Sequence, residues 1–347
     1  MKVCLFPADQ QGCGFYRIRE PGRVAADLGV EVEYRTGIDL TVDQKGRVVG
    51  AEELDVDVVV FQRPAQDQAL QVIPLLQSKG IAVVVEIDDD IEHIPPENPA
   101  WKDYHPVLGG GVESKVRVME ASRIADGVTV GTPTLQGIYG GTVLRNCIPE
   151  RVLDISTTPI HTFGWAGAGE FHRGDFKPCG GAVAQAVRSA GGGFSIGARN
   201  ASEVASWLGL SDGQWEKSHY WDVPCGEHYK TLDYRIGIVP LAPNLFNQSK
   251  SWLKGLENAA LGIPTVASWT AAYEEWALEE KSGVLLAQAP KEWKRHLTRL
   301  TLDSGLYEDC VEYGRAAAAR WTFEARAEDW VEAWEAARIA RHHAVAA

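Results

Sequence analysis

The stretch NQSKSWLKGLENAALGIPTVAS, residues 247–268, combines side chains that could bind phosphate. On a helix, at 100° per residue, Lys250, Lys254 and Glu257 point within about 40° of one direction. Leucines and alanines occupy the adjoining face, so the apolar face would anchor the helix and the charged face would be open to a ligand. The spacing therefore predicts a helix that presents two ammonium groups and one carboxylate.

The residues just before these lysines, 247–249, are polar and suited to a helix N-terminus. Free amides and the positive end of the helix dipole lie at such a terminus, where a phosphate binds well. A second interpretation stays open. Lys254 and Glu257 at this spacing can also pair on a solvated helix, which is worth about 0.2–0.5 kcal/mol.

Short apolar runs alternate with amphipathic helical stretches along the whole chain, which is typical of parallel α/β units. The predicted strands lie at 1–8, 30–36, 56–64, 81–91, 127–133 and 141–149, and then at 161–170, 192–198, 232–241, 263–269 and 283–288. Runs such as VVVF and AVVV are apolar throughout, as in a sheet covered on both faces. The sequence GCGFYR, after the first strand, is expected to form a glycine loop.

The chain is predicted to fold as two Rossmann-like α/β domains that face each other. The first covers residues 1–154, a Thr- and Pro-containing linker covers 155–161, and the second covers 162–320. Residues 321–347 are expected to form a helix whose tryptophans pack in a core, and crossing back to the first domain is one arrangement open to it. Ligands of open α/β sheets bind beyond the carboxyl ends of the strands, so the loops there are the candidate sites.

Composition narrows the classes of protein. The net charge of −13 disfavours non-specific binding to nucleic acid or to anionic membranes. No run reaches the roughly 18 apolar residues of a membrane-spanning helix, and the N-terminal residues lack the apolar core of a signal peptide. We therefore expect a cytoplasmic protein without a membrane span. The six cysteines are scattered singly, so neither a disulfide framework nor a zinc site is expected.

Two segments carry a resemblance to a known family. Residues 257–268, ENAALGIPTVAS, resemble a segment of retaining GT-B glycosyltransferases of the broad GT4-like type. Residues 232–241, LDYRIGIVPL, resemble the strand and proline that precede this segment. In that family a glutamate at the start of the segment binds the ribose of a nucleotide sugar, and the resemblance gives this role to Glu257.

The start of the second domain is similar to the same group. GWAG at 164–167, followed by His172, Arg173 and Asp175, looks like the first strand and loop of the nucleotide domain in bacteriophage and CgeB-like glycosyltransferases. The resemblance makes His172 a candidate catalytic residue and Arg173 a candidate ligand of the donor phosphates. An exposed arginine without such a role is the alternative.

The first half of the chain also resembles this group. Gly12 and Gly14 look like its glycine loop, which makes them candidate ligand-binding residues, and residues 62–64 resemble a strand-end motif. Asp88 and Asp89 begin a run of three aspartates after a strand. Three consecutive side chains cannot all point one way, so a Mg²⁺ site is not favoured. The resemblance places Asp88 and Asp89 on the acceptor side, one of them near the reacting hydroxyl.

One position departs from the family pattern. The family has a second glutamate eight residues before the ribose-binding one, where it touches the transferred sugar, and this chain has Ser249 there. The donor, a UDP-sugar or a GDP-sugar, is therefore not identified by the sequence. The resemblance implies that Lys250 and Lys254 grip the diphosphate beside Ser249. No metal or other cofactor is expected, because cations and amide dipoles can stabilise the leaving group.

The resemblance implies a glycosyltransferase of the hexosyltransferase class. It would move a sugar from a nucleotide-diphospho-sugar to an acceptor across the cleft between the domains, with retention of configuration. The phage-like resemblance suggests a virion protein or a glycan as acceptor and the host cytoplasm as location. Hydroxymethylated DNA bases are an alternative acceptor that the negative charge disfavours. Two other functions stay open: a sugar-nucleotide epimerase, and a non-catalytic nucleotide-binding protein on the same frame.

Overall fold

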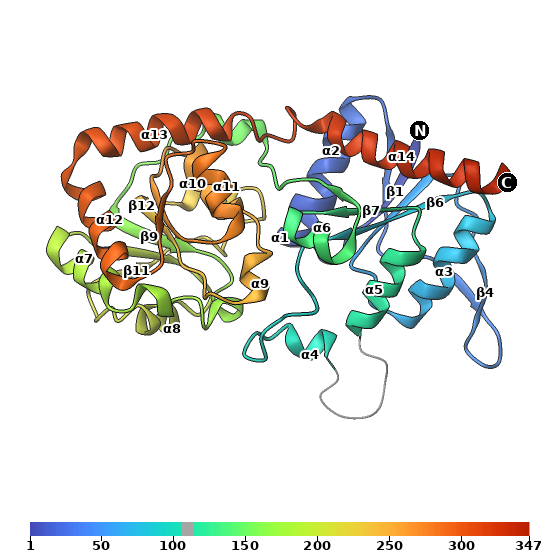
Figure 1. Cartoon of the computed structure of the whole chain (residues 1–347), viewed down its shortest axis with the longest axis horizontal. Coiled ribbons are helices and arrows are strands. Elements are labelled where there is room, and N and C mark those ends of the chain that lie inside the picture. Colours follow the sequence, from blue (N-terminus) through green and yellow to red (C-terminus); the bar gives the residue numbers. More distant parts are fainter. Residues whose placement is uncertain (106–113, 347) are drawn as a thin grey trace. The chain divides into compact units, whose positions relative to one another are not determined.

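The computed structural model describes residues 1–105 and 114–346 of the chain (Figure 1). Contacts divide the chain into two compact units. Unit 1 comprises Met1–Ile94, Ala100–Asn146 and Phe323–Ala347, and unit 2 comprises Pro95–Pro99 and Cys147–Thr322. Each unit thus takes a segment from the other half of the sequence. The C-terminal helix belongs to unit 1, and a short segment around position 97 belongs to unit 2.

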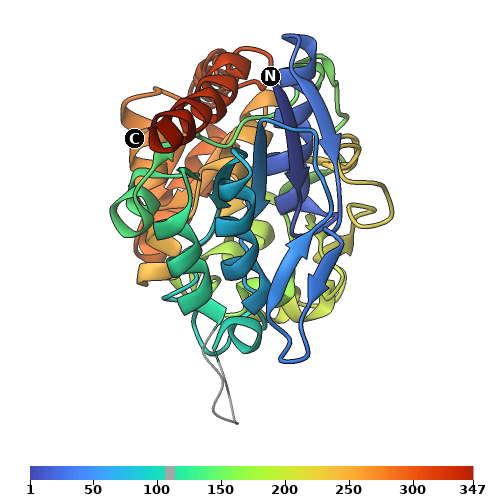
Figure 2. The same cartoon turned by 90° about the vertical axis from the view of Figure 1, so that its right-hand side faces the viewer.

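Unit 1 is built on a six-stranded parallel sheet. Its strands are β1 (Lys2–Phe6), β2 (Glu31–Tyr34), β5 (Val58–Gln62), β6 (Ala82–Ile87), β7 (Gly127–Val130) and β8 (Thr142–Val143), in the order β2-β1-β5-β6-β7-β8. The central strands β5 and β6 are valine-rich and buried, as expected for a sheet covered on both faces. The sequence analysis missed an antiparallel hairpin, β3 (Leu40–Val42) and β4 (Val48–Ala51), which lies at the side of this unit (Figure 2).

The helices of unit 1 connect these strands. They are α1 (Gly12–Gly14), a π-helical turn (Phe15–Arg19), α2 (Glu20–Asp27), α3 (Asp67–Ser78), α4 (Trp101–Tyr104), α5 (Ser114–Ile124), α6 (Pro133–Tyr139) and α14 (Ala327–Ala346). The expected glycine loop at GCGFYR is wrong, because the chain is helical from Gly12 onward. The Asp9 carboxylate accepts the backbone N–H groups of Gln11 and Gly14, at 2.8 and 3.1 Å, and so starts the helix where the glycines suggested a loop.

Helix α14 packs on α2 and on strands β5, β6 and β7 of unit 1. Its Trp330 and Trp334 are 2% and 1% exposed. These two tryptophans are core residues, as the sequence analysis predicts, whereas Trp321 lies before the helix and is half-buried.

Unit 2 contains a second six-stranded parallel sheet. Its strands are β9 (His161–Ala166), β10 (Phe194–Gly197), β11 (Trp215–Lys217), β12 (Tyr234–Val239), β13 (Thr265–Ser268) and β14 (Leu285–Ala287), in the order β11-β10-β9-β12-β13-β14. The first and fourth strands of the unit, β9 and β12, are neighbours at the centre, which is the strand order of Rossmann sheets. The order reverses between β9 and β12, so the loops after these two strands flank the expected ligand position.

The helices of unit 2 cover this sheet and supply its loops. The α-helices are α7 (Ala182–Ala190), α8 (Ala201–Trp207), α9 (Leu245–Gln248), α10 (Leu253–Ala260), α11 (Ala271–Leu278), α12 (Pro290–Leu302) and α13 (Ser304–Ala318), and short 3₁₀ turns lie at Glu150–Asp154, Gly169–His172, Lys177–Cys179 and His228–Thr231. The helix predicted to begin at residues 247–249 is interrupted. Helix α9 ends at Gln248, α10 begins at Leu253, and Lys250 lies between them.

Helix α10 is fixed against the sheet by one buried asparagine. Asn258 donates from Nδ2 to Thr265 Oγ1 on β13 at 3.1 Å and accepts at Oδ1 from the hydroxyl of Tyr234 on β12, also at 3.1 Å. The helix ends at Ala260, and Gly262 follows it with a φ of +70°, which suits glycine at this position after a helix. These contacts set the direction in which α10 presents its polar side chains.

Candidate functional site

Six of the ten candidate residues from the sequence lie in the connections that follow β9 and β12, either in loops or on helix α10. All of them belong to unit 2; they are His172, Arg173, Ser249, Lys250, Lys254 and Glu257. The other four candidates belong to unit 1; they are Gly12, Gly14, Asp88 and Asp89. The candidates thus form two groups of residues, each within its own unit.

Lys254 reaches from α10 to the carboxyl end of β9. Its Nζ donates to the carbonyl oxygen of Ala166 at 2.7 Å and lies 5.5 Å from the centre of the Trp165 ring. A β-carbon at Gly167 would stand 2.5 Å from this Nζ, so a larger residue there would require the lysine to shift. Burial lowers the pKa of Lys254, and the charge of Lys250 lowers it further, while Glu257 opposes them. A bound anion would therefore stabilise the charged form of Lys254, which burial and the charge of Lys250 disfavour.

Lys250 and Ser249 occupy the break between α9 and α10. The Nζ of Lys250 lies 4.2 Å from the centre of the Phe246 ring, an attractive cation–π distance. Ser249 is 1% exposed, and its hydroxyl donates to the carbonyl oxygen of Leu245 at 3.4 Å. Position 249 is thus packed inside the loop.

Glu257 is held by a histidine that the sequence analysis missed. The backbone N–H of Gly226 donates to Nδ1 of His228 at 3.2 Å, so the ring proton sits on Nε2. That nitrogen is 3.3 Å from Oε1 of Glu257 and donates to it. Both side chains are buried, at 4% and 6% exposed. His228 therefore orients the carboxylate that the family resemblance assigns to ribose binding.

A second histidine–carboxylate pair lies in the loop after β9. Nδ1 of His172 is 2.7 Å from Oδ2 of Asp175, and the other oxygen of Asp175 accepts from Asn247 Nδ2 at 2.6 Å and from the backbone N–H of Ala242 at 3.0 Å. Burial acts to raise the pKa of Asp175, but these donors outweigh it and the net pKa is lowered. Burial lowers the pKa of His172, and Lys254 and Lys250 act in the same direction.

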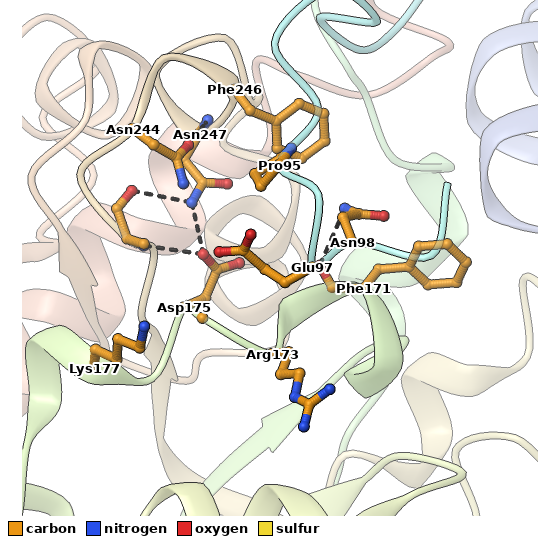
Figure 3. A pocket seen from close by; sticks show the side chains of 12 residues that line it. Pro95, Glu97, Asn98, Phe171, Arg173, Asp175, Lys177, Asn244, Phe246 and Asn247 are labelled. Carbon is orange, nitrogen blue, oxygen red and sulfur yellow. Dashed lines mark hydrogen bonds between the residues drawn. The ribbon is translucent and has the colours of Figure 1, made fainter. Parts of the chain in front are cut away.

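A pocket opens beside this pair (Figure 3). It lies within unit 2. The residues that line it are Pro95, Glu97, Asn98, Phe171, Arg173, Gly174, Asp175, Lys177, Ala242, Asn244, Phe246 and Asn247. Most come from the loops after β9 and β12, and the first three come from the segment Pro95–Pro99 that joins unit 2 from the N-terminal half of the chain. Of the predicted residues only Arg173 lines this pocket directly.

The candidates in unit 1 gather around the carboxyl ends of β1, β5 and β6. Arg63 has a positive φ of 46°, and its guanidinium lies 3.1 Å from Asp9 Oδ2 and 3.2 Å from Asp88 Oδ1. Burial acts to raise the pKa of Asp88, but the charge of Arg63 outweighs it and the net pKa is lowered. A β-carbon at Gly14 would stand 2.0 Å from the Asp9 carbonyl oxygen, whereas Gly12 has open space beside it. Asp88 is thus committed to a salt bridge within the unit.

In the two described segments no three His, Cys, Asp or Glu side chains are grouped so that they could hold a metal ion. None of the described helices is both long and apolar enough to cross a membrane.

Two parallel six-stranded sheets with flanking helices define an α/β protein with the fold of GT-B glycosyltransferases, and the predicted fold class is confirmed. No protein-family model and no curated protein sequence matches the chain. Among solved structures, sucrose-phosphate synthase from Thermosynechococcus elongatus superposes with a TM-score of 0.59 over 100% of both chains at 13% identity. HepE of Anabaena, in complex with UDP-glucose, gives 0.60 over 96% of this chain and 98% of that one at 11% identity. The pneumococcal O-GlcNAc transferase GtfA, in complex with UDP and GlcNAc, gives 0.56 over 81% and 56% at 12% identity.

Proposed function

We propose that the chain is a glycosyltransferase that takes a sugar from a nucleotide-diphospho-sugar bound by unit 2. The observation that supports this most is the placement of Lys254 and Glu257. They share one helix, and Lys254 reaches the end of β9 at the point where the strand order of the sheet reverses. The ammonium group of Lys254 forms no ion pair within the described residues, and a diphosphate would supply one.

The residues present suit the departure of a nucleoside diphosphate. Negative charge grows on the leaving phosphate, and Lys250 and Lys254 would stabilise it as it forms, so no metal is required. Glu257, oriented by His228, would accept hydrogen bonds from the ribose hydroxyls, and Arg173 would add a cation beside the phosphates. Structures of similar fold hold UDP or UDP-glucose, which makes a UDP-sugar the first donor to try.

The acceptor side belongs to unit 1 in this proposal. Asp88, oriented by its salt bridge with Arg63, and Asp89 would contact the acceptor hydroxyl. Open space beside Gly12 would let the backbone approach a ligand, whereas Gly14 packs against the Asp9 carbonyl oxygen. His172, which the resemblance names as a catalytic candidate, lies in unit 2 beside the lysines. Transfer of a hexosyl group with retention, a GT4-like affiliation, a phage context and a cytoplasmic location follow from the resemblance alone. The acceptor would be a virion protein or a glycan, with modified DNA as the alternative.

The test is thermal melting of the protein with UDP, GDP and their sugar conjugates. A ligand that binds only the folded state stabilises it by about 2.7 kcal/mol at a hundred times its dissociation constant. We expect one nucleotide family to raise the melting temperature of the wild type and of Glu308→Ala, which changes an exposed glutamate on α13. The same ligand should shift Glu257→Ala far less, measured against the ligand-free melting temperature of that variant.

The outcomes separate the candidate functions. A shift followed by sugar transfer to an added acceptor supports the proposal. Conversion of the free nucleotide sugar without an acceptor would select an epimerase, and tight binding without any turnover would select a non-catalytic binding protein. No shift with any of the nucleotides would reject the donor site.

A further inference from the structure

The ring of Phe246 lies between the pocket beside His172 and the ammonium group of Lys250. Phe246 lines the pocket, and the same ring has the Lys250 ammonium 4.2 Å from its centre. Asp175 also lines the pocket, and its histidine partner is close enough to both lysines for their charges to act on it. A ligand whose phosphates bind at Lys250 and Lys254 could therefore place the group attached to them in this pocket.

One buried side chain in the pocket has an acceptor without a donor. Nδ2 of Asn247 donates to Asp175 Oδ1 at 2.6 Å and to the Ala242 carbonyl oxygen at 3.0 Å. Both partners are acceptors, so the amide cannot be flipped, and its oxygen must point away from them, as Figure 3 shows. Asn247 is 1% exposed, and within the described residues nothing donates to this oxygen. It is an acceptor that a ligand hydroxyl could satisfy.

The carboxylate of Glu97 also lines this pocket, although it comes from a distant part of the sequence. Glu97 lies in the segment Pro95–Pro99, where Asn98 donates from Nδ2 to the carbonyl oxygen of Phe171 at 3.3 Å and so ties the segment to the loop after β9. Oε1 of Glu97 lies 3.6 Å from the point where a β-carbon at Gly174 would stand. In the part of the chain that the structure describes, this carboxylate has neither a hydrogen bond nor an ion pair.

We propose that this pocket binds the sugar ring of the donor, and that Glu97 and Asn247 select it by accepting hydrogen bonds from its hydroxyl groups. The inference rests on the proposed function, because it uses the diphosphate to bring the sugar to the pocket. A sugar hydroxyl is a donor, which both of these groups need, and it can accept in turn from Arg173 or Lys177 on the rim. Glu97 is the specificity-determining residue of the pair that can be changed safely, since it is exposed and holds no other side chain.

The test measures the sugar's own contribution to binding. Dissociation constants for UDP, UDP-glucose, UDP-galactose, UDP-N-acetylglucosamine and UDP-glucuronate are measured by calorimetry for the wild type, Glu97→Gln and Glu308→Gln, with GDP and GDP-mannose run in parallel. For the preferred neutral sugar, we expect Glu97→Gln to lower the ratio of the dissociation constant for UDP to that for the UDP-sugar about fivefold, because a neutral amide oxygen replaces a carboxylate as acceptor. The affinity for UDP itself should stay within about twofold, and Glu308→Gln should match the wild type in both.

Analogues that lack one hydroxyl sharpen the test without touching the buried Asn247. One mono-deoxy form of the preferred sugar should lose about tenfold in affinity for the wild type and about twofold for Glu97→Gln, because the neutral amide oxygen is a weaker acceptor than the carboxylate. Equal losses in both proteins would overturn the assignment of Glu97. Tighter binding of UDP-glucuronate or of inorganic phosphate by Glu97→Gln, with neutral sugars unchanged, would show that the pocket takes an anion.

Binding of UDP alone distinguishes a wrong sugar pocket from a wrong donor site. If UDP binds the wild type and no UDP-sugar binds more tightly than UDP, the donor site stands and the sugar pocket is overturned. If no nucleotide binds at all, both are overturned.

Discussion

The two units place different chemistry at the same edge of similar sheets. In unit 1, Arg17 and Glu86 form a buried ion pair at 2.7 Å, with side chains 1% and 0% exposed, and Arg63 is shared between Asp9 and Asp88. In unit 2, the Lys254 ammonium donates to a carbonyl oxygen and forms no ion pair within the described residues. The charged side chains of unit 1 thus pair with one another, whereas Lys254 has no counter-charge of its own.

This difference shows that position on the fold does not by itself identify a ligand site. Both groups lie beyond the carboxyl ends of parallel strands, where ligands of such sheets bind. A buried cation without an ion pair is available to an anionic ligand. Lys254 has no ion pair within the described residues, so unit 2 is the better candidate for donor binding, whereas Arg17 and Glu86 of unit 1 compensate each other. Four measurements test this contrast, beginning with the largest expected effect.

The strongest test removes the buried cation of unit 1. Besides Glu86, Arg17 donates to the Leu144 carbonyl oxygen at 2.6 Å and to Asn146 Oδ1 at 2.9 Å, and it lies 4.7 Å from the Trp330 ring centre. Burial already raises the pKa of Glu86, and Arg17 opposes that rise. Arg17→Met would leave a buried carboxylate uncompensated, so we expect a loss of about 3–5 kcal/mol in the free energy of unfolding, measured with denaturant.

A paired variant separates charge burial from packing. Arg17→Met combined with Glu86→Leu removes both charges, and we expect it to recover most of the stability. The affinity of folded Arg17→Met for UDP should remain close to that of the wild type, because the residues proposed to bind UDP belong to unit 2. A single variant that unfolds as the wild type does, or a double variant no better than the single, would contradict the structural role given to this pair.

The next test removes the cation of unit 2. Lys254→Met should weaken UDP binding about 10- to 100-fold, because a hydrogen bond to a charged group is lost. The ligand-free protein should be as stable as the wild type or more so, since burial lowers the pKa of Lys254 and thus disfavours its charged form. Lys291→Met, which changes an exposed lysine on α12, is the control. A destabilised variant with unchanged UDP affinity would make Lys254 a structural residue like Arg17.

The sequence predicted the sheets and the charged helix face better than the helix boundaries. Valine-rich runs marked the buried strands, and the spacing of Lys254 and Glu257 placed both on one helix. The start of that helix was predicted too early. Trp252 is 1% exposed and packs against Trp276 at 5.2 Å between ring centres, so tertiary packing decides where α10 begins. Local helix signals at residues 247–249 contain no information about that contact.

The pocket could not be predicted from local patterns. Glu97 and Asn98 come from a segment more than seventy residues before the loop they contact, and no motif marked them. Asn247 was treated as part of a helix N-terminus, whereas its side chain holds Asp175. His228 was missed because a single histidine in a loop carries no signal until Glu257 is placed beside it. Such residues are recognised only by the partners they have or lack in three dimensions.

A smaller effect is expected from the positioning of Glu257. His228→Phe keeps a ring but removes the N–H that orients the carboxylate, so UDP affinity should fall about 3- to 10-fold. The preference for UDP over 2′-deoxy-UDP should fall with it, because the ribose hydroxyl is the group that Glu257 is expected to read. His228→Gln retains a donor and should keep part of that preference. If both variants lose affinity for UDP and 2′-deoxy-UDP equally, His228 supports the fold and not the ribose site.

The smallest effect concerns pH and His172. Burial lowers the pKa of His172 below the usual histidine value of about 6.5, so the unfolded chain takes up this proton more readily than the folded one. The stability that depends on neutral His172 is therefore complete above about pH 6.5 and is lost as the pH falls towards the lowered value. His172→Gln should lose less stability than the wild type between pH 7 and 5, by at most about 1.4 kcal/mol per pH unit, the slope for one proton. His219→Gln, at an exposed histidine of the same unit, is the control, and identical slopes for wild type and His172→Gln would show that His172 is not held neutral beside the lysines.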